Sequence, residues 1–147
     1  MSTNWTVLIS VREQERDLQM QRLATATLQL RDGETACQDA RLDLQRALTE
    51  ARGAGSTGAL DVRRLTAQRE HIHRLQQTLD QCEASLSAAC ERVDNERRLL
   101  MTAEQRLEQL ERLARQELEA AATKTAQRQQ RELEEIWQAT HTNRRSA

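Results

Sequence analysis

The fold is decided by residues 65–114, which read LTAQREHIHRLQQTLDQCEASLSAACERVDNERRLLMTAEQRLEQLERLA. Every seventh residue of this stretch is apolar or small: Leu65, Ile72, Leu79, Leu86, Val93, Leu100, Leu107 and Ala114. Three residues after most of them stands a second such residue: Leu75, Cys82, Ala89, Ala103 and Leu110. This is the a and d pattern of a heptad repeat, which only a helix packed along its length on another helix needs. The interval of seven residues predicts a left-handed coiled coil.

The composition also favours long helices over a globular core. The 147 residues include no proline, four glycines and two aromatic residues, Trp5 and Trp137. A globular core of this size usually uses several aromatic side chains because each buries a large area. Charged residues make up 31% of the chain and the mean hydropathy is −0.82, which suits a narrow apolar seam. Disorder is the competing interpretation of such a polar chain, but disordered segments lack a sustained heptad.

Charge and hydropathy bear on the class of partner. The 22 basic and 23 acidic residues are interspersed and leave a net charge of −1, so the sequence lacks the basic stripe expected of a nucleic-acid-binding protein. No run approaches the apolar length of a membrane helix. The apolar run at residues 5–9 is too short for the core of a signal peptide. We therefore expect a cytoplasmic protein that binds no nucleic acid and has no membrane span.

One segment interrupts the helical pattern, GAGSTG at residues 53–58. Three glycines in six residues end a helix and permit a tight connection. A short loop between long helices places them antiparallel. The predicted fold is therefore all-α, an antiparallel coiled-coil hairpin of two long helices in which the second is longer than the first. The predicted bounds are helix 1 at about 4–52, a glycine-rich turn at 53–59, helix 2 at about 60–140 and a frayed tail at 141–147, all within a single elongated domain of residues 1–147.

A stripe of mostly small residues before the turn supplies the partner of the heptad seam: Ala26, Leu30, Gly33, Cys37, Ala40, Leu44, Ala47 and Ala51. Upstream we expect the seam to continue, less regularly, through Leu8, Val11, Leu18 and Leu23. Folding the chain about Ser56 makes Ala26 face Leu86 and leaves Cys37 too far along the seam to meet Cys82. The same register pairs Ala40 with Ile72, Val11 with Leu100 and Trp5 with Leu107.

No group of residues predicts catalysis or a cofactor. His71 and His73 are two residues apart, so they point in different directions from a helix, whereas metal pairs need a spacing of three or four. The GxxxxG spacing of the turn lacks the lysine and the Ser or Thr that follow in a phosphate-binding loop. A two-helix hairpin also offers no concave pocket that excludes water. We expect no enzymatic activity, no metal and no cofactor.

The unequal helix lengths leave the end of the second helix without an intramolecular partner from about residue 108. An apolar stripe nevertheless continues there: Leu110, Leu113, Leu118, Ala122, Ala126, Leu133, Ile136 and Trp137. An apolar stripe with nothing to bury it predicts a binding surface. Dimerisation through this end, or fraying, is the alternative interpretation. Trp137 is the strongest candidate for an anchor of the interface because it has no partner in the hairpin.

With these features the chain resembles the FliJ family, the small soluble component of the flagellar type III export apparatus. The resemblance covers the order and lengths of the helices, the glycine-rich turn and three short sequences: RVD at 92–94, QRL at 105–107 and RELEEIW at 131–137. It implies a coiled-coil stalk in the cytoplasm, peripheral to the inner membrane at the flagellar base. Such a stalk inserts into the ring of the export ATPase, links it to the cytosolic domain of the export gate, and binds export chaperones.

The resemblance also implies two contact sites. The terminal end would contact the export ATPase through Val7, Val11, Leu18, Leu23, Leu118, Leu133, Ile136 and Trp137. The half beside the turn would dock to the export gate through Ala40, Leu44, Ala47, Ala51, His71, Leu75, Thr78 and Cys82. Two alternatives stay open: a stalk protein of a virulence-type type III secretion system, and a structural coiled coil that associates with itself.

Overall fold

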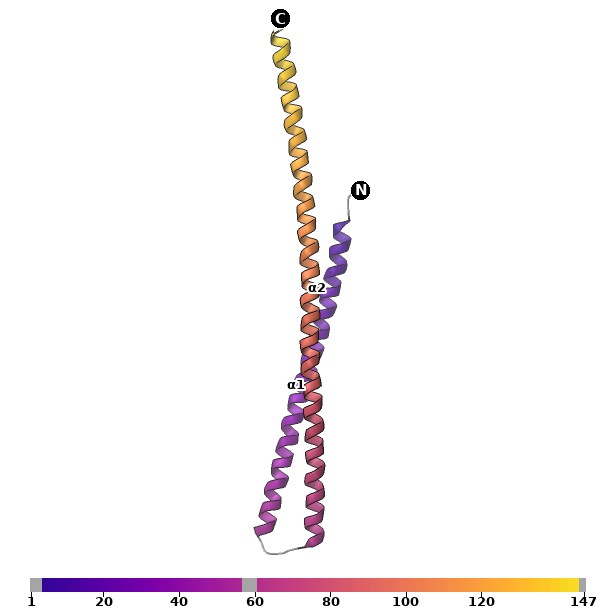
Figure 1. The fold of residues 1–147 in the computed structure, drawn as a ribbon, viewed down its shortest axis with the longest axis vertical. Helices are drawn as coiled ribbons and strands as arrows, with labels where there is room; N and C mark the ends of the chain where they lie inside the picture. Colours follow the sequence, from indigo (N-terminus) through magenta and orange to yellow (C-terminus); the bar gives the residue numbers. More distant parts are fainter. Residues whose placement is uncertain (1–3, 57–60, 146–147) are drawn as a thin grey trace. The chain divides into compact units, whose positions relative to one another are not determined.

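The computed structural model contains two α-helices, and it describes residues 4–56 and 61–145 (Figure 1). Helix α1 spans Trp5–Ser56 and helix α2 spans Val62–Arg145, with 52 and 84 residues respectively. No strand occurs in the described part of the chain. The structure thus confirms an all-α fold of two long helices in which the second is the longer.

Short polar side chains cap the first turn of both helices. The backbone N–H of Val7 donates to Oδ1 of Asn4 at 3.4 Å, and the backbone N–H of Arg63 donates to Oδ1 of Asp61 at 3.1 Å. Both side chains satisfy a donor that has no partner within its own helix. The sequence therefore defines the two helix starts locally, independently of how the helices pack.

Both helices extend beyond their predicted ends. Helix α1 continues through Gly53 to Ser56 instead of ending at residue 52, so the predicted turn at 53–59 is wrong for its first four residues, and residues 57–59 lie outside the described part. A glycine inside a helix costs only about 1 kcal/mol, and Ala54 continues the half-buried face of Ala47 and Ala51. The predicted frayed tail is helical as far as Arg145, where two arginines in the last turn favour the helix dipole.

The contacts between the helices group into two compact units. The hairpin unit consists of Arg16–Thr102, and the terminal unit consists of Met1–Glu15 with Ala103–Ala147. Each unit therefore contains a part of α1 and a part of α2. The two units differ in how much of α2 is covered.

In the hairpin unit, α1 and α2 run antiparallel and bury a seam with a spacing of three and four residues. On α1 the buried or half-buried positions include Arg16, Gln19, Leu23, Ala26, Leu30, Gly33, Cys37, Ala40, Leu44, Ala47 and Ala51. On α2 they include Gln68, Ile72, Leu75, Leu79, Cys82, Leu86, Ala89, Val93, Glu96 and Leu100. These are the a and d positions of the heptad repeat. The predicted seam is confirmed from Ile72 onward, whereas Leu65 is exposed.

The register of this seam is one heptad away from the predicted one. Leu86 was expected to face Ala26, but its Cδ1 atom lies 3.5 Å from the position of a Cβ on Gly33. The predicted fold point at Ser56 is itself helical, so the actual fold point lies further along the chain. A shift of one heptad keeps every a and d residue in the seam, which is why the pattern alone did not distinguish the two registers.

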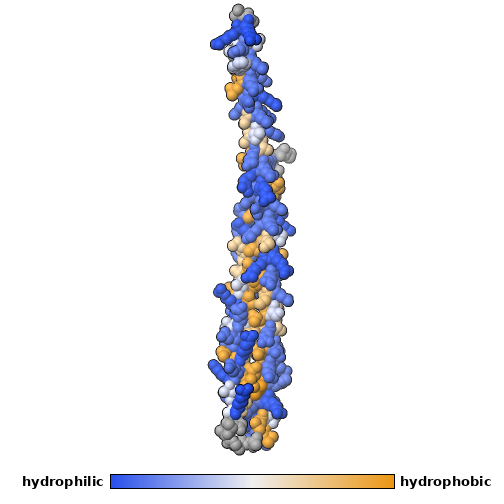
Figure 2. Space-filling model, turned by 60° about the vertical axis from the view of Figure 1, so that its left-hand side comes forward, coloured by the Kyte–Doolittle hydropathy of each residue, from blue (hydrophilic) through white to orange (hydrophobic). Residues whose placement is uncertain are grey.

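The seam joins small residues of α1 to large residues of α2. The most buried apolar residues of α1 are Ala26, Cys37, Ala40 and Ala47, whereas α2 supplies Val93 and the neighbouring leucines. Figure 2 shows the resulting apolar band between hydrophilic surfaces in the lower part of the molecule. Small residues let two helices approach closely, and the larger side chains opposite then fill the space.

A polar layer interrupts this apolar seam. Gln19 is only 7% exposed, and its Nε2 donates to the backbone carbonyl of Glu96 at 3.2 Å and to the Glu96 carboxylate. At the exposed edge of the seam, Arg92, one turn before Glu96 on α2, donates to Oε1 of Gln29 at 2.8 Å. A polar pair inside an apolar seam disfavours other registers, because any shift leaves its members without partners. This layer supplies the register information that the apolar pattern lacks.

In the terminal unit, the first turns of α1 pack on α2. Trp5 and Ile9 are half-buried on α1, and Ala103, Leu107, Leu110 and Ala114 are buried or half-buried on α2. The Trp5 Nε1 donates to the Glu117 carboxylate rather than packing near Leu107 as predicted. Glu117 lies further along α2 than Leu107, so the register differs from the predicted one in the same direction as in the hairpin unit.

We predict that Gly33→Ala raises the melting temperature by about 2–3 °C, because a helical glycine costs about 0.5–1 kcal/mol relative to alanine. The added methyl group would meet Leu86 at 3.5 Å, an ordinary contact distance. Gly53→Ala is the control, since a Cβ there has nothing within 4 Å. A lower melting temperature for Gly33→Ala beside a raised one for Gly53→Ala would show that the seam is tighter at Gly33 than described.

The polar layer predicts that a single substitution lowers the free energy of unfolding and that a double substitution restores it. Gln19→Leu should lower the free energy of unfolding by about 1–2 kcal/mol because the half-buried Glu96 loses its donor. Gln19→Leu combined with Glu96→Leu should recover or exceed the wild-type value, because the seam is then apolar throughout. Urea denaturation measures both. A double variant that is less stable than Gln19→Leu alone would contradict this account.

Candidate functional site

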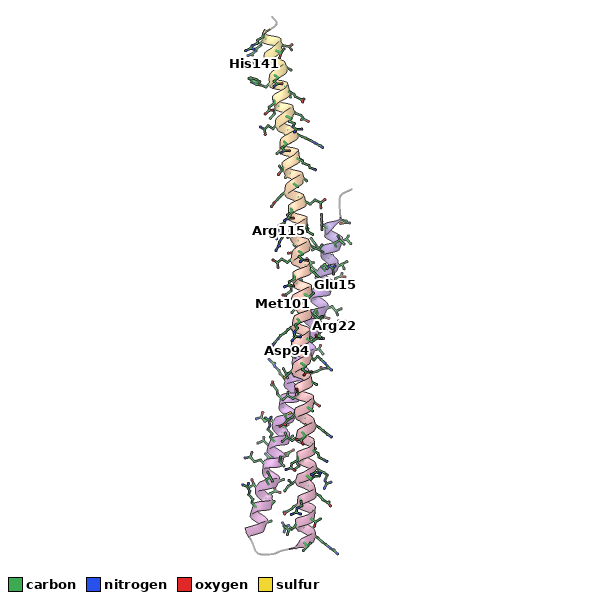
Figure 3. The ribbon with its side chains drawn as sticks, viewed as in Figure 1. Glu15, Arg22, Asp94, Met101, Arg115 and His141 are labelled. Atoms are coloured by element: carbon green, nitrogen blue, oxygen red, sulfur yellow. The ribbon has the colours of Figure 1, made fainter. Side chains whose placement is uncertain are left out.

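The surface left uncovered on α2 is the candidate functional site. We call residues 118–145 the C-terminal segment. All of its residues are exposed, and so are residues 115–117 just before it. Figure 3 labels Arg115 and His141 near its two ends. The uncovered stretch begins after Ala114, a few residues later than predicted, because α1 reaches Glu117 through Trp5.

Large apolar residues of the C-terminal segment are exposed to an unusual degree. Leu118, Leu133, Ile136 and Trp137 are 73%, 67%, 63% and 62% exposed. Leu133, Ile136 and Trp137 stand at i, i+3 and i+4, so they share one face of the helix. Leu118 precedes Ile136 by about five turns of helix and returns to the same face. These four residues form what we call the apolar stripe.

The indole of Trp137 is held by a neighbouring ring. The rings of Trp137 and His141 stack with their centroids 4.1 Å apart and their planes at 21°. The two residues are one helical turn apart, so each limits the rotamers of the other. The sequence did contain this signal, a tryptophan and a histidine spaced by four. It was missed because His141 was assigned to a frayed tail.

An acidic group accompanies the apolar stripe. Glu132, Glu134 and Glu135 stand between and beside its residues, and Gln130 donates to Oε1 of Glu134 at 3.5 Å. These carboxylates keep the exposed face hydrated. They bring negative charge next to Leu133 and Ile136, whereas Arg144 and Arg145 bring positive charge to the end of the segment beyond His141.

The predicted contact residues of α1 fall into two kinds. Val7 and Val11 in the terminal unit, and Leu18 in the hairpin unit, are exposed and available to a partner. Leu23 is half-buried in the seam. The prediction that the seam passes through Leu8, Val11 and Leu18 is therefore wrong. The strict heptad that includes Leu23 extends back through Arg16 and Ile9 instead, and it takes precedence over isolated apolar residues because it is continuous with the longer buried pattern.

The residues expected to dock to the export gate lie mostly inside the hairpin unit. Ala40 and Ala47 are buried, and Leu44, Ala51, Leu75 and Cys82 are half-buried. Only His71 and Thr78 of this group are exposed. His71 lies beside a shallow groove between α1 and α2 that is lined by Asp43, Arg46, Ala47, Glu50, His71 and Leu75. The surface available to a partner here is this charged groove, while the buried members of the group hold the two helices together.

Cys37 and Cys82 were predicted to lie too far apart along the seam to meet, and this prediction is wrong. Cys37 is 1% exposed, and the register in which Leu86 lies opposite Gly33 places Cys82 opposite it. The shift of one heptad brings these two residues together. Burial raises the pKa of the Cys37 thiol, and the neighbouring Cys82 and Glu83 raise it further, whereas Arg41 lowers it.

The described residues carry neither a metal-binding cluster nor a spanning helix. No group of three or more His, Cys, Asp or Glu residues among them is arranged to hold a metal ion. Within residues 4–56 and 61–145, neither helix combines the length and apolar character needed to cross a bilayer. Uncharged apolar side chains on a regular helix offer contact area rather than reactive groups.

Comparison with protein-family models, with curated proteins and with solved structures finds no match for this chain.

Proposed function

We propose that this protein is a coiled-coil stalk of a type III protein export apparatus of the flagellar kind. In this proposal the C-terminal segment binds the ring of the export ATPase and the stalk couples that ring to the export gate. The observation that carries the proposal is the apolar stripe, which is exposed on the part of α2 that α1 does not cover, whereas Val93, Leu107 and the half-buried leucines of α2 lie in the seam. The resemblance to the FliJ family supplies the identity of the partner.

The apolar stripe has the properties of a binding anchor. Burying one Leu or Ile side chain contributes about 1.5–3 kcal/mol, and tryptophan is the residue most enriched among interface residues with large energetic effects. Leu133, Ile136 and Trp137 lie on one face, so a single groove on a partner can receive all three. Stacking on His141 restricts Trp137 before binding, which lowers the entropy lost when the partner orders it.

Charge complementarity favours a basic partner surface. The carboxylates at residues 132, 134 and 135 surround the anchor with negative charge. Opposite charges across an interface raise the rate of association and disfavour partners of like charge. We therefore expect the ATPase surface that receives this helix to carry Arg or Lys residues around an apolar groove.

Docking to the export gate would use the exposed edge of the hairpin unit rather than its buried alanines. The groove beside His71 offers Asp43, Arg46 and Glu50, which suit a polar contact. Binding of export chaperones and a cytoplasmic position at the flagellar base follow from the resemblance alone. A stalk of a virulence-type secretion system would have the same architecture and would differ in its partners.

Self-association is the second candidate, and the same apolar stripe favours it. A second copy of the chain would bury the stripe against itself through the face that carries Leu118, Leu133 and Ile136. In the hairpin unit the seam is already satisfied within one chain, so a dimer would use only the C-terminal segment.

The central test is the double variant Ile136→Asp with Trp137→Ala. We predict that it loses stimulation of the export ATPase while the melting temperature stays within about 1 °C of wild type, because both residues are exposed. Leu28→Asp with Leu42→Ala is the matched control, since these residues are also exposed but lie in the hairpin unit. ATP hydrolysis is measured with each protein. Full stimulation by the first variant would refute the assignment of the apolar stripe to the ATPase.

A truncation after Glu117 tests which part of the chain carries any self-association. We predict that the full chain is a monomer or a weak dimer and that the truncated chain is a helical monomer, because the truncation removes the apolar stripe. Sedimentation equilibrium over a range of concentrations gives the mass, and circular dichroism gives the helicity. A tight dimer that survives the truncation would instead place the self-association in the hairpin unit.

A further inference from the structure

The two thiols that meet in the hairpin unit have no part in the proposed function. Cys37 occupies an a position of α1 and Cys82 a d position of α2, so the pair bridges the two helices across the seam. All three cysteines are free thiols in this structure, and the third, Cys90, is exposed. In an antiparallel coiled coil, a residue at a faces a residue at d of the other helix. The register in which Leu86 lies opposite Gly33 places Cys82 opposite Cys37, four residues further along α1 and four residues earlier on α2.

The two thiols differ in how a reagent reaches them. Cys37 is 1% exposed, whereas Cys82 is half-buried. The ion pair between Arg41 Nη2 and Glu83 Oε1, at 3.6 Å, spans the edge of the seam beside them, and both of its side chains are largely exposed. A small disulfide therefore reaches the Cys82 sulfur from solvent and does not reach that of Cys37.

We propose that Cys37 and Cys82 form a reversible interhelical disulfide when the protein meets a low-molecular-weight disulfide such as oxidised glutathione. The Cys82 thiolate attacks one sulfur of oxidised glutathione, forms a mixed disulfide and releases one glutathione thiolate. The Cys37 thiolate then attacks the Cys82 sulfur and releases the second glutathione. The two cysteines lose two electrons and two protons, and oxidised glutathione gains both as two glutathione thiols.

The disulfide would fix the register of the hairpin unit. It joins α1 to α2 between the polar layer at Gln19 and the end of α1, and so prevents the one-heptad slip that the apolar pattern alone allows. It also closes a loop from Cys37 to Cys82, which restricts the unfolded chain. We therefore expect the oxidised protein to melt about 10 °C above the reduced protein.

The test uses the full chain with Cys90→Ser, so that the exposed thiol forms no bond between molecules. After treatment with oxidised glutathione, the intact mass should fall by two hydrogens with no glutathione adduct, and dithiothreitol should reverse the change. Peptide mapping should join the peptides of Cys37 and Cys82. A glutathione adduct that persists on Cys82, or two thiols that stay reduced, would overturn the proposal.

A matched control moves one thiol by one heptad. The variant Cys82→Ala, Ala89→Cys, Cys90→Ser keeps the number of thiols and the a and d positions but separates the pair along the seam. It should form no interhelical disulfide and no reversible gain in melting temperature. If it forms the disulfide as fully as the parent, the pairing in the structure is not what directs the reaction. Cys37→Ala with Cys90→Ser is the second control, and it should retain the glutathione adduct on Cys82.

Discussion

The structure depends on the burial of a narrow seam in which the two helices contribute side chains of different size. Helix α1 supplies mostly alanine, glycine and cysteine, with leucine at 23, 30 and 44, and α2 supplies mostly leucine, isoleucine and valine, with Cys82 and Ala89. No aromatic side chain belongs to this seam in the hairpin unit. The apolar area is therefore small for each residue, and the helices need many heptads to gain the stability that a globular core gains from a few large residues. The stability of the paired helices therefore depends on the number of heptads that they bury.

The sequence predicted those features that follow from periodicity. The interval of seven from Ile72 to Ala114 identified the a positions of α2, and the unequal spacing around the glycines identified two helices of unequal length. The bounds were less accurate because glycine marks a helix end only statistically. Gly53 is helical here, since Ala54 beside it still has a half-buried place in the seam.

The register of the two helices could not be predicted from the apolar pattern, for a physical reason. A slip of one heptad exchanges one apolar layer for another, so the hydrophobic energy changes little. The hydrogen bonds of Gln19 with Glu96 are lost in any such slip, and they depend on two polar residues that look like interruptions when each helix is read alone. The exposure of Leu118, Leu133, Ile136 and Trp137 was predicted correctly because it requires only that α1 be too short to cover them, whereas Leu110, also predicted to be uncovered, is half-buried. The meeting of Cys37 with Cys82 was missed because it depends on the register.

The uncovered end of α2 also has a thermodynamic consequence. Its helical state rests largely on local propensity and on pairs such as Trp137 with His141, since all of residues 118–145 are exposed. Helices in proteins gain most of their stability from the packing of an amphipathic face, and here that face is exposed. A partner that binds the segment therefore also selects its helical population, and part of the binding energy is consumed in ordering it. Such an interface has a lower net affinity than its contact area alone would give.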